Sequence, residues 1–77
     1  MKNKLFSLEG RERYCLIKTM TIDERDKVCD SYRDCKFCPM AVLYRSRPIC
    51  VDCVVGFRIL RLLELGYKFT QAPTNVP

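Results

Sequence analysis

The spacing of apolar and polar residues near the N-terminus predicts a β-hairpin over 4–19. Two short apolar runs, 5–8 and 14–17, are separated by a charged loop that contains Gly10. A glycine-containing loop between two β-favouring runs is typical of a hairpin. Cys15 belongs to the second run, and we expect it to be buried as a small apolar side chain.

A capping box predicts a short helix over 22–33. Thr21 and Glu24 have the spacing at which a threonine hydroxyl accepts a bond from a first-turn amide and a glutamate accepts one from the threonine amide. Apolar residues follow at helical spacing, and we expect them to form the buried face: Val28, Cys29 and Tyr32.

The longest apolar-rich stretch predicts a second helix over 49–65. Pro48 suits the first position of a helix, where its missing amide costs nothing, and Gly66 suits a left-handed stop. Phe57 and Leu65 fall on the polar side of this helix, so it needs cover from two directions. Its main apolar side comprises Val51, Val55, Ile59, Leu60, Leu62 and Leu63. Its polar side comprises Arg58, Arg61, Glu64 and Lys68.

The remaining segments are predicted to be irregular. Residues 40–47 lie between two prolines and should form a loop, and 70–77 has two prolines and no charge, which favours a flexible tail. The rest, 1–69, should form one domain, since the chain has 77 residues. So small a domain rarely folds on its apolar core alone, and we expect a metal, disulfides or a partner to stabilise it.

Two Cys-x-x-Cys pairs, separated by the eleven residues 39–49, predict a metal site over 35–53. Thiol pairs at this spacing can place four sulfurs around one tetrahedral ion. The predicted ligands of one Zn²⁺ are Cys35, Cys38, Cys50 and Cys53. An iron–sulfur cluster is the alternative cofactor, and Cys29 is an alternative ligand in place of Cys53. The spacing alone does not choose between them.

The two pairs resemble those of a treble-clef zinc finger. The resemblance is carried by Cys35-x-x-Cys38 and by Pro48-Ile-Cys50-x-x-Cys53, which leads into a predicted helix. Over 35–66 the chain is similar to the zinc-binding form of a small-subunit ribosomal protein, but it lacks the dense basic residues of that family. The resemblance implies a fold and a ligand set, not a ribosomal role. We expect a small α+β zinc-stabilised domain, treble-clef-like, with an N-terminal hairpin, a short helix, a zinc knuckle and a long C-terminal helix.

The formal net charge of +5 points to an anionic partner. Four thiolates and one Zn²⁺ together carry −2, so a loaded site leaves +3, a thin basis for a dedicated nucleic-acid binder. Nucleic-acid binding is therefore the alternative function. Its candidate residues are Lys36, Tyr44, Arg45, Arg47, Arg58 and Arg61.

Surplus apolar residues favour a protein partner, with candidate contacts at Phe57, Leu65, Tyr67 and Phe69. A zinc site closed by four sulfurs is structural, and the chain has no histidine to act as a catalytic base. We therefore predict a non-enzymatic zinc-binding adaptor for a larger protein or ribonucleoprotein machine, such as an RNA polymerase or a ribosome. A homodimer that covers the same surface is an alternative.

The apolar stretches also bear on location. Each is too short, or too often interrupted by charge, for an export signal or a membrane span. We expect a cytoplasmic protein, in which paired cysteines bind metal more often than they form disulfides.

Overall fold

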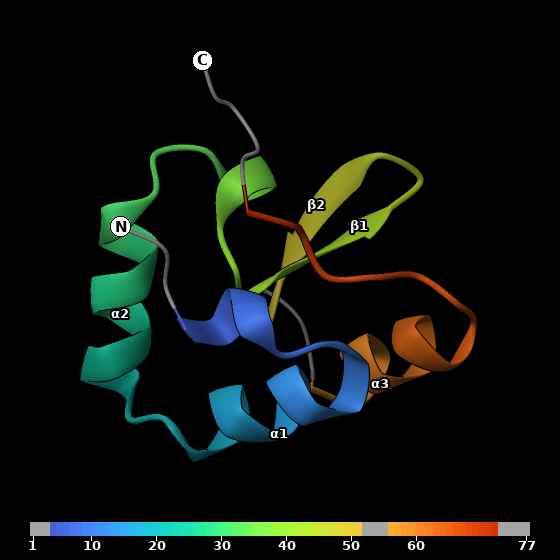
Figure 1. Ribbon diagram of the computed structural model, residues 1–77, viewed down its shortest axis with the longest axis horizontal. Coiled ribbons are helices and arrows are strands. Elements are labelled where there is room, and N and C mark those ends of the chain that lie inside the picture. Colours follow the sequence, from blue (N-terminus) through green and yellow to red (C-terminus); the bar gives the residue numbers. More distant parts are fainter. Residues whose placement is uncertain (1–3, 52–55, 73–77) are drawn as a thin grey trace.

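The computed structural model describes residues 4–51 and 56–72, and this part of the chain forms three α-helices that lie to one side of a β-hairpin (Figure 1). The elements in chain order are η1 (Lys4–Ser7), α1 (Gly10–Thr19), α2 (Ile22–Ser31), η2 (Cys35–Phe37), β1 (Ala41–Tyr44), β2 (Arg47–Cys50) and α3 (Gly56–Glu64), where η marks a 3-10 turn. The α+β composition agrees with expectation, but the order of the elements does not.

The N-terminal segment is helical, so the predicted hairpin over 4–19 is wrong. Tyr14 and Ile17 are both buried at a spacing of three, which places them on one face of α1. A short apolar run such as 14–17 does not distinguish a strand from a helix, and burial of this face decides for the helix. Gly10 has a φ of +52° and begins α1, while Cys15 is exposed. The expected burial of Cys15 is therefore also wrong.

The capping-box helix is confirmed as α2. The Thr21 hydroxyl accepts from the Glu24 amide at 3.1 Å, and Glu24 Oε1 accepts from the Thr21 amide at 2.8 Å. These bonds lower the pKa of the Glu24 carboxyl. The helix ends at Ser31, earlier than predicted, because Tyr32 already has an extended backbone. Val28 is buried and Cys29 is half-buried, as expected.

A β-hairpin replaces the predicted loop over 40–47 and the start of the predicted long helix. β1 and β2 are antiparallel, with Tyr44 opposite Arg47. The two turn residues, Arg45 and Ser46, have φ values of 51° and 68°. Two positive φ angles are typical of a type I′ turn, which usually carries Asn-Gly or Asp-Gly. The chain has neither, so the sequence gives no signal for this hairpin.

The hairpin is extended on one side by the C-terminal segment. The Leu43 amide donates to the Lys68 carbonyl at 3.0 Å, and the Thr70 amide donates to the Ala41 carbonyl at 2.8 Å. Within the described residues β1 is therefore central and β2 is at the edge. An edge position explains why Pro48, which has no amide hydrogen, is tolerated in β2.

The predicted helix over 49–65 is wrong in its first part. Ile49 and Cys50 belong to β2, and the Val51 amide donates to the Met40 carbonyl at 2.9 Å. Residues 52–55 lie outside the described part of the chain, and α3 spans Gly56–Glu64. β-branched residues favour a strand when a partner strand is available, and β1 provides it.

The predicted stop of this helix at Gly66 is confirmed. Gly66 has a φ of +100° and its amide donates to the Leu63 carbonyl at 3.0 Å, while the Tyr67 amide donates to the Leu62 carbonyl at 3.0 Å. These two bonds form a Schellman motif, which needs a left-handed residue at its turn.

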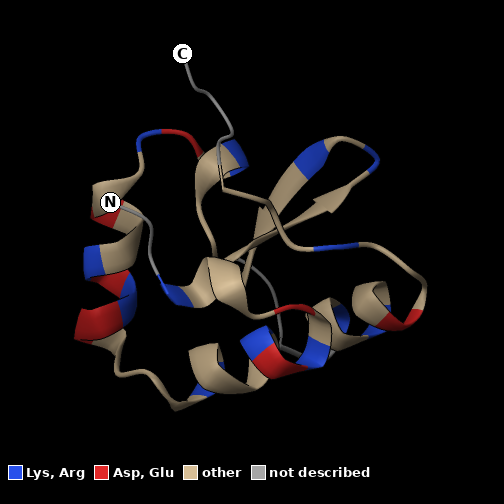
Figure 2. Cartoon of the chain, viewed as in Figure 1, with Lys and Arg blue, Asp and Glu red and all other residues tan. Residues whose placement is uncertain are grey.

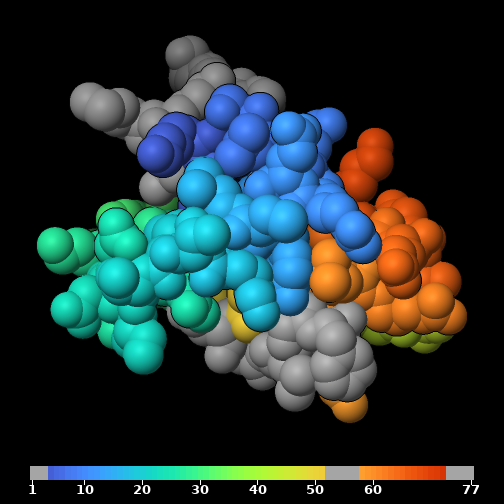
Figure 3. Space-filling view, turned by 90° about the horizontal axis from the view of Figure 1, so that it is seen from below, coloured from blue at the N-terminus to red at the C-terminus, as the bar shows by residue number. Residues whose placement is uncertain are grey.

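One continuous core joins these elements. From below, α1 lies between α2 and α3 (Figure 3). The buried apolar side chains of the core are Leu5, Tyr14, Ile17, Val28, Cys38, Met40, Val42, Cys50, Val51, Ile59 and Phe69. No helix among the described residues has the length and apolar content needed to cross a bilayer.

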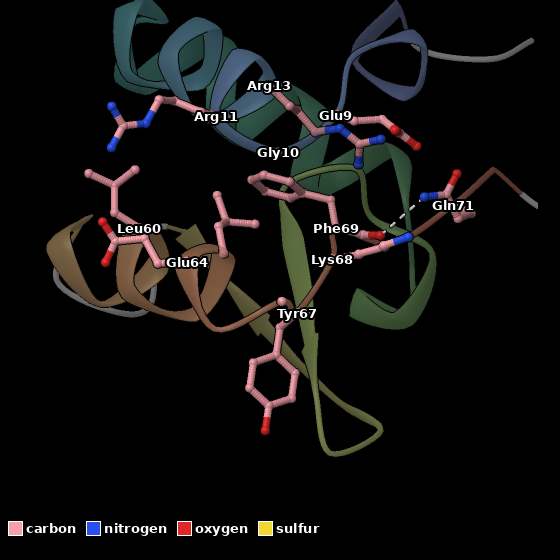
Figure 4. A pocket seen from close by; sticks show the side chains of 12 residues that line it. Glu9, Gly10, Arg11, Arg13, Leu60, Glu64, Tyr67, Lys68, Phe69 and Gln71 are labelled. Atoms are coloured by element: carbon pink, nitrogen blue, oxygen red, sulfur yellow. Dashed lines mark hydrogen bonds between the residues drawn. The ribbon is translucent and has the colours of Figure 1, made fainter.

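Arg13 is fully buried within this core and joins three parts of the chain. Its Nε donates to the Leu8 carbonyl at 2.8 Å, and its Nη1 donates to the carbonyls of Pro39 at 3.1 Å and Thr70 at 2.8 Å. The guanidinium also lies 4.9 Å from the centre of the Phe69 ring (Figure 4). We call this arrangement the Arg13 clamp. Thr70, the first residue of the predicted tail, is buried in it, whereas 73–77 lie outside the described residues.

Candidate metal centre

Two of the four predicted ligands, Cys38 and Cys50, lie together in the core. Cys38 follows η2 and is 2% exposed, and Cys50 ends β2 and is 5% exposed. Their side chains are hydrogen-bonded to each other, and Cys29 of α2 is close enough to act electrostatically on Cys38. We call Cys29, Cys38 and Cys50 the thiol cluster. It joins three elements that are separate in sequence.

Local hydrogen bonds place Cys38 where it meets Cys50. The first Cys-x-x-Cys is one 3-10 turn, in which the Cys38 amide donates to the Cys35 carbonyl at 3.1 Å. Asp34 caps this turn by accepting from the Lys36 amide at 2.9 Å. The Cys38 carbonyl then accepts from the Ala41 amide and from the Thr70 hydroxyl. The turn is therefore fixed at both ends, with Cys38 inside and Cys35 exposed.

The surroundings of the thiol cluster keep Cys38 protonated. The hydrogen bond with Cys50 raises the pKa of the Cys38 thiol, and burial raises it further. A thiol with a raised pKa is a weaker nucleophile at neutral pH, because less of it is present as thiolate. A cation that binds here must displace the proton and neutralise a buried thiolate, which is the chemistry of a structural zinc ligand.

The complete predicted ligand set is not assembled in the described part of the chain. Within residues 4–51 and 56–72 no group of three or more metal-ligating side chains has the geometry to hold an ion. Cys53 lies outside these residues, and Cys35 is exposed while Cys38 and Cys50 are buried. The treble-clef-like fold is wrong as well, because Cys50 ends a strand instead of beginning a long helix. The donor types that do converge, thiols alone, suit a soft cation.

Most of the predicted nucleic-acid contacts lie around one surface groove of about 670 Å³ between the hairpin and α3. We call it the α3 groove. Its lining residues are Tyr44, Ile49, Arg58, Leu60, Arg61, Leu62 and Glu64. Arg45 lies over the Tyr44 ring, 5.2 Å from its centre, and Arg47 pairs with Tyr44 across the hairpin. Lys36 is apart from them, in η2, which precedes the end of the hairpin opposite the turn.

The predicted protein contacts are more scattered. Leu65 is 58% exposed, and Tyr67 is half-buried with its ring edge-on to Tyr44 at 4.8 Å. Phe69 is 2% exposed and belongs to the core, because it bridges to β1. Its assignment as a surface contact is corrected accordingly. The side chain of Phe57 lies outside what the structure describes.

Sequence reasoning missed the aliphatic floor of the α3 groove and the Arg13 clamp. Ile49 of β2 and Leu60 of α3 line the same groove, and this arrangement depends on the hairpin, which the sequence did not predict. No local signal distinguishes Arg13 from the exposed Arg11 beside it. Arg13 also borders a second hollow of about 390 Å³ (Figure 4). It has no accessible surface there, so it supports the fold and does not contact solutes.

No known protein family, curated protein or solved structure matches this chain. The resemblance to a zinc-binding ribosomal protein therefore stays a prediction.

Proposed function

We propose that the protein is a non-enzymatic adaptor whose fold is stabilised by one Zn²⁺. The observation that carries the proposal is the buried pair Cys38 and Cys50, with Cys29 beside it. The spacing of the two Cys-x-x-Cys pairs supports the same proposal, because a domain this small usually needs a metal, disulfides or a partner in addition to its apolar core. Zinc bound by four cysteines would cross-link these elements without any catalytic step.

Several cysteines compete for the remaining coordination positions. The sequence favours Cys35 and Cys53 as partners of Cys38 and Cys50, while the position of Cys29 supports it as the alternative ligand. An iron–sulfur cluster remains the competing cofactor, since it accepts the same thiolates. The proposed location is the cytoplasm, a reducing compartment in which paired cysteines bind metal more often than they form disulfides.

The test is the metal content of the purified full chain, measured by elemental analysis together with the visible absorption spectrum. We expect one zinc per chain and a colourless protein. Serine variants of Cys29, Cys35 and Cys53 then identify the ligands, with exposed Cys15→Ser as the matched control. A brown protein that contains iron, or a chain that binds no metal when cobalt or zinc is supplied, would refute the zinc proposal.

The adaptor part of the proposal is supported by the α3 groove. Its floor is aliphatic, and an apolar surface of this kind is more often covered by a partner than left in water. The partner class that we propose is a larger protein or ribonucleoprotein machine.

Nucleic-acid binding is the second candidate, because Tyr44, Arg45, Arg47, Arg58 and Arg61 gather at one end of the hairpin and on α3. A mobility-shift series with rising salt tests it. Neutralisation of phosphates by these arginines predicts that affinity falls steeply as salt increases. Affinity that does not change with salt would exclude this candidate.

A further inference from the structure

The α3 groove has an aliphatic floor contributed by two elements. Ile49 comes from β2, and Leu60 and Leu62 come from α3; all three are half-buried and pack against the edge of the core. The volume of about 670 Å³ is in the range of pockets that accept a large apolar side chain or a small ligand. The floor therefore has room for an apolar anchor.

The rim of the groove carries a surplus of positive charge. Arg58 and Arg61 are exposed on α3, and Arg45 lies above Tyr44 at the turn (Figure 2). Among the described residues of the lining, Glu64 is the one that is acidic, and its Oε1 lies 3.7 Å from Nη1 of Arg61. Since both side chains of that pair are more than half exposed, it is weak. Three guanidinium groups, which can each bind a carboxylate through two hydrogen bonds, thus face one carboxylate.

The hairpin turn adds an independent indication of a binding surface. Arg45 and Ser46 adopt left-handed backbone angles without being glycine or asparagine, and these angles are unfavourable because Cβ lies too close to the following carbonyl oxygen. Strained positions of this kind are concentrated at functional sites. This turn position is occupied by an arginine instead of a small residue, and the arginine lies over the Tyr44 ring that lines the groove.

These features favour a protein partner over a nucleic acid. One face of the Tyr44 ring is covered by Arg45, and Tyr67 contacts the ring edge-on, so Tyr44 does not present an open platform for a base. An aliphatic floor between basic residues instead suits an amphipathic helix, which lays its apolar face into a groove.

We propose that the α3 groove docks an acidic amphipathic segment of a partner protein, an inference that rests on the adaptor function proposed above. Apolar side chains of the segment enter between Ile49 and Leu62, and flanking carboxylates bind Arg58 and Arg45.

The probe is a fluorescein-labelled synthetic helix of about 14 residues, with leucine at positions i, i+3, i+4 and i+7 and glutamate on both flanks. The fluorescence anisotropy of the labelled peptide is measured while the zinc-loaded full chain is added. We expect saturable binding, at least tenfold weaker for a peptide of the same composition in scrambled order. Arg58→Glu on the rim and Ile49→Ala in the floor should each weaken binding about tenfold. Arg11→Glu makes the same change of charge at an exposed position of α1 outside the lining; it is the matched control and should leave binding unchanged.

Each contrary result has one meaning. Equal binding of the scrambled peptide, an equal loss of binding in Arg11→Glu, or no binding at all overturns the groove inference. Binding of an oligothymidine probe in place of the peptide overturns it in favour of the nucleic-acid candidate. Zinc content and the thermal melt are recorded on the same samples. A chain that holds zinc and melts cooperatively but ignores the peptide therefore refutes the groove inference and leaves the metal proposal standing.

Discussion

The Arg13 clamp and the thiol cluster hold the same small core in two different ways. In the clamp the chain supplies both sides of every contact: one guanidinium donates to three carbonyls and lies against aromatic rings. In the thiol cluster, Cys38 and Cys50 are buried and hydrogen-bonded to each other, and a thiol is a weak donor and a weak acceptor. The Arg13 clamp stabilises the core as soon as the chain folds. The thiols of the cluster would stabilise it most after a cation has replaced their protons.

The clamp nevertheless has a cost of its own. Burial lowers the pKa of Arg13, with the carboxylate of Glu9 acting in the opposite direction, and its Nη2 has no hydrogen-bond partner among the described residues. A buried charge with incomplete hydrogen bonding contributes less stability than its number of contacts suggests. Removing the Arg13 guanidinium should still lower the free energy of unfolding, since the carbonyls that accept its hydrogen bonds would lose their donor.

The largest effect should come from the thiol side of the comparison. Cys38→Ser removes a proposed zinc ligand from the core and should lower the free energy of unfolding by about 4 kcal/mol or more in zinc buffer. Urea unfolding followed by circular dichroism measures the change. Cys15→Ser, on the exposed face of α1, is the control and should stay within about 0.5 kcal/mol of the natural chain. Equal effects of the two substitutions would mean that the thiol cluster has no special role.

Breaking the clamp should have the next largest effect. Arg13→Met keeps the apolar stem but deprives the buried carbonyls of Pro39 and Thr70 of their donor, at a cost of about 3 kcal/mol. Unlike the cysteine variant, it should lose this stability both with and without zinc. The same urea experiment compares it with Arg11→Met, which is exposed and should be nearly neutral. If Arg13→Met were as stable as that control, the clamp would not stabilise the fold.

A smaller and opposite effect is expected at the hairpin turn, which belongs to neither region. The double substitution Arg45→Asn and Ser46→Gly supplies the residues that a type I′ turn favours and should stabilise the protein by about 1 kcal/mol. Its thermal melt, compared with that of the natural chain, provides the measurement. A lower melting temperature would show that the left-handed geometry of these residues is not strained.

The smallest effect concerns the capping box of α2, a purely local contact. Because folding lowers the pKa of Glu24, its charge stabilises the folded state above the ordinary value of 4.5, and this contribution disappears as the pH falls through the lowered value. Glu24→Gln should therefore be slightly less stable than the natural chain at pH 7 and equal to it near pH 2. A stability difference that stays constant with pH would contradict the role of the charge.

The comparison also explains which parts of the fold could be predicted. The α2 cap and the Gly66 stop depend on residues within a few positions of one another, so the sequence reveals them. The pairing of Cys38 with Cys50 was likewise suggested by their spacing. By contrast, α1 could not be distinguished from a strand by its short apolar run, and the hairpin has a turn without the usual residues. The burial of Arg13 depends on carbonyls 26 and 57 positions away, which no local pattern indicates.

The most direct test of the account is a pair of thermal melts of the purified full chain, one zinc-loaded and one after treatment with a strong chelator. The account predicts a cooperative transition for the zinc-loaded protein, and a loss of cooperativity or a large drop in melting temperature once the metal is removed. Identical melts would contradict it, because the buried thiols would then stabilise the core without any cation.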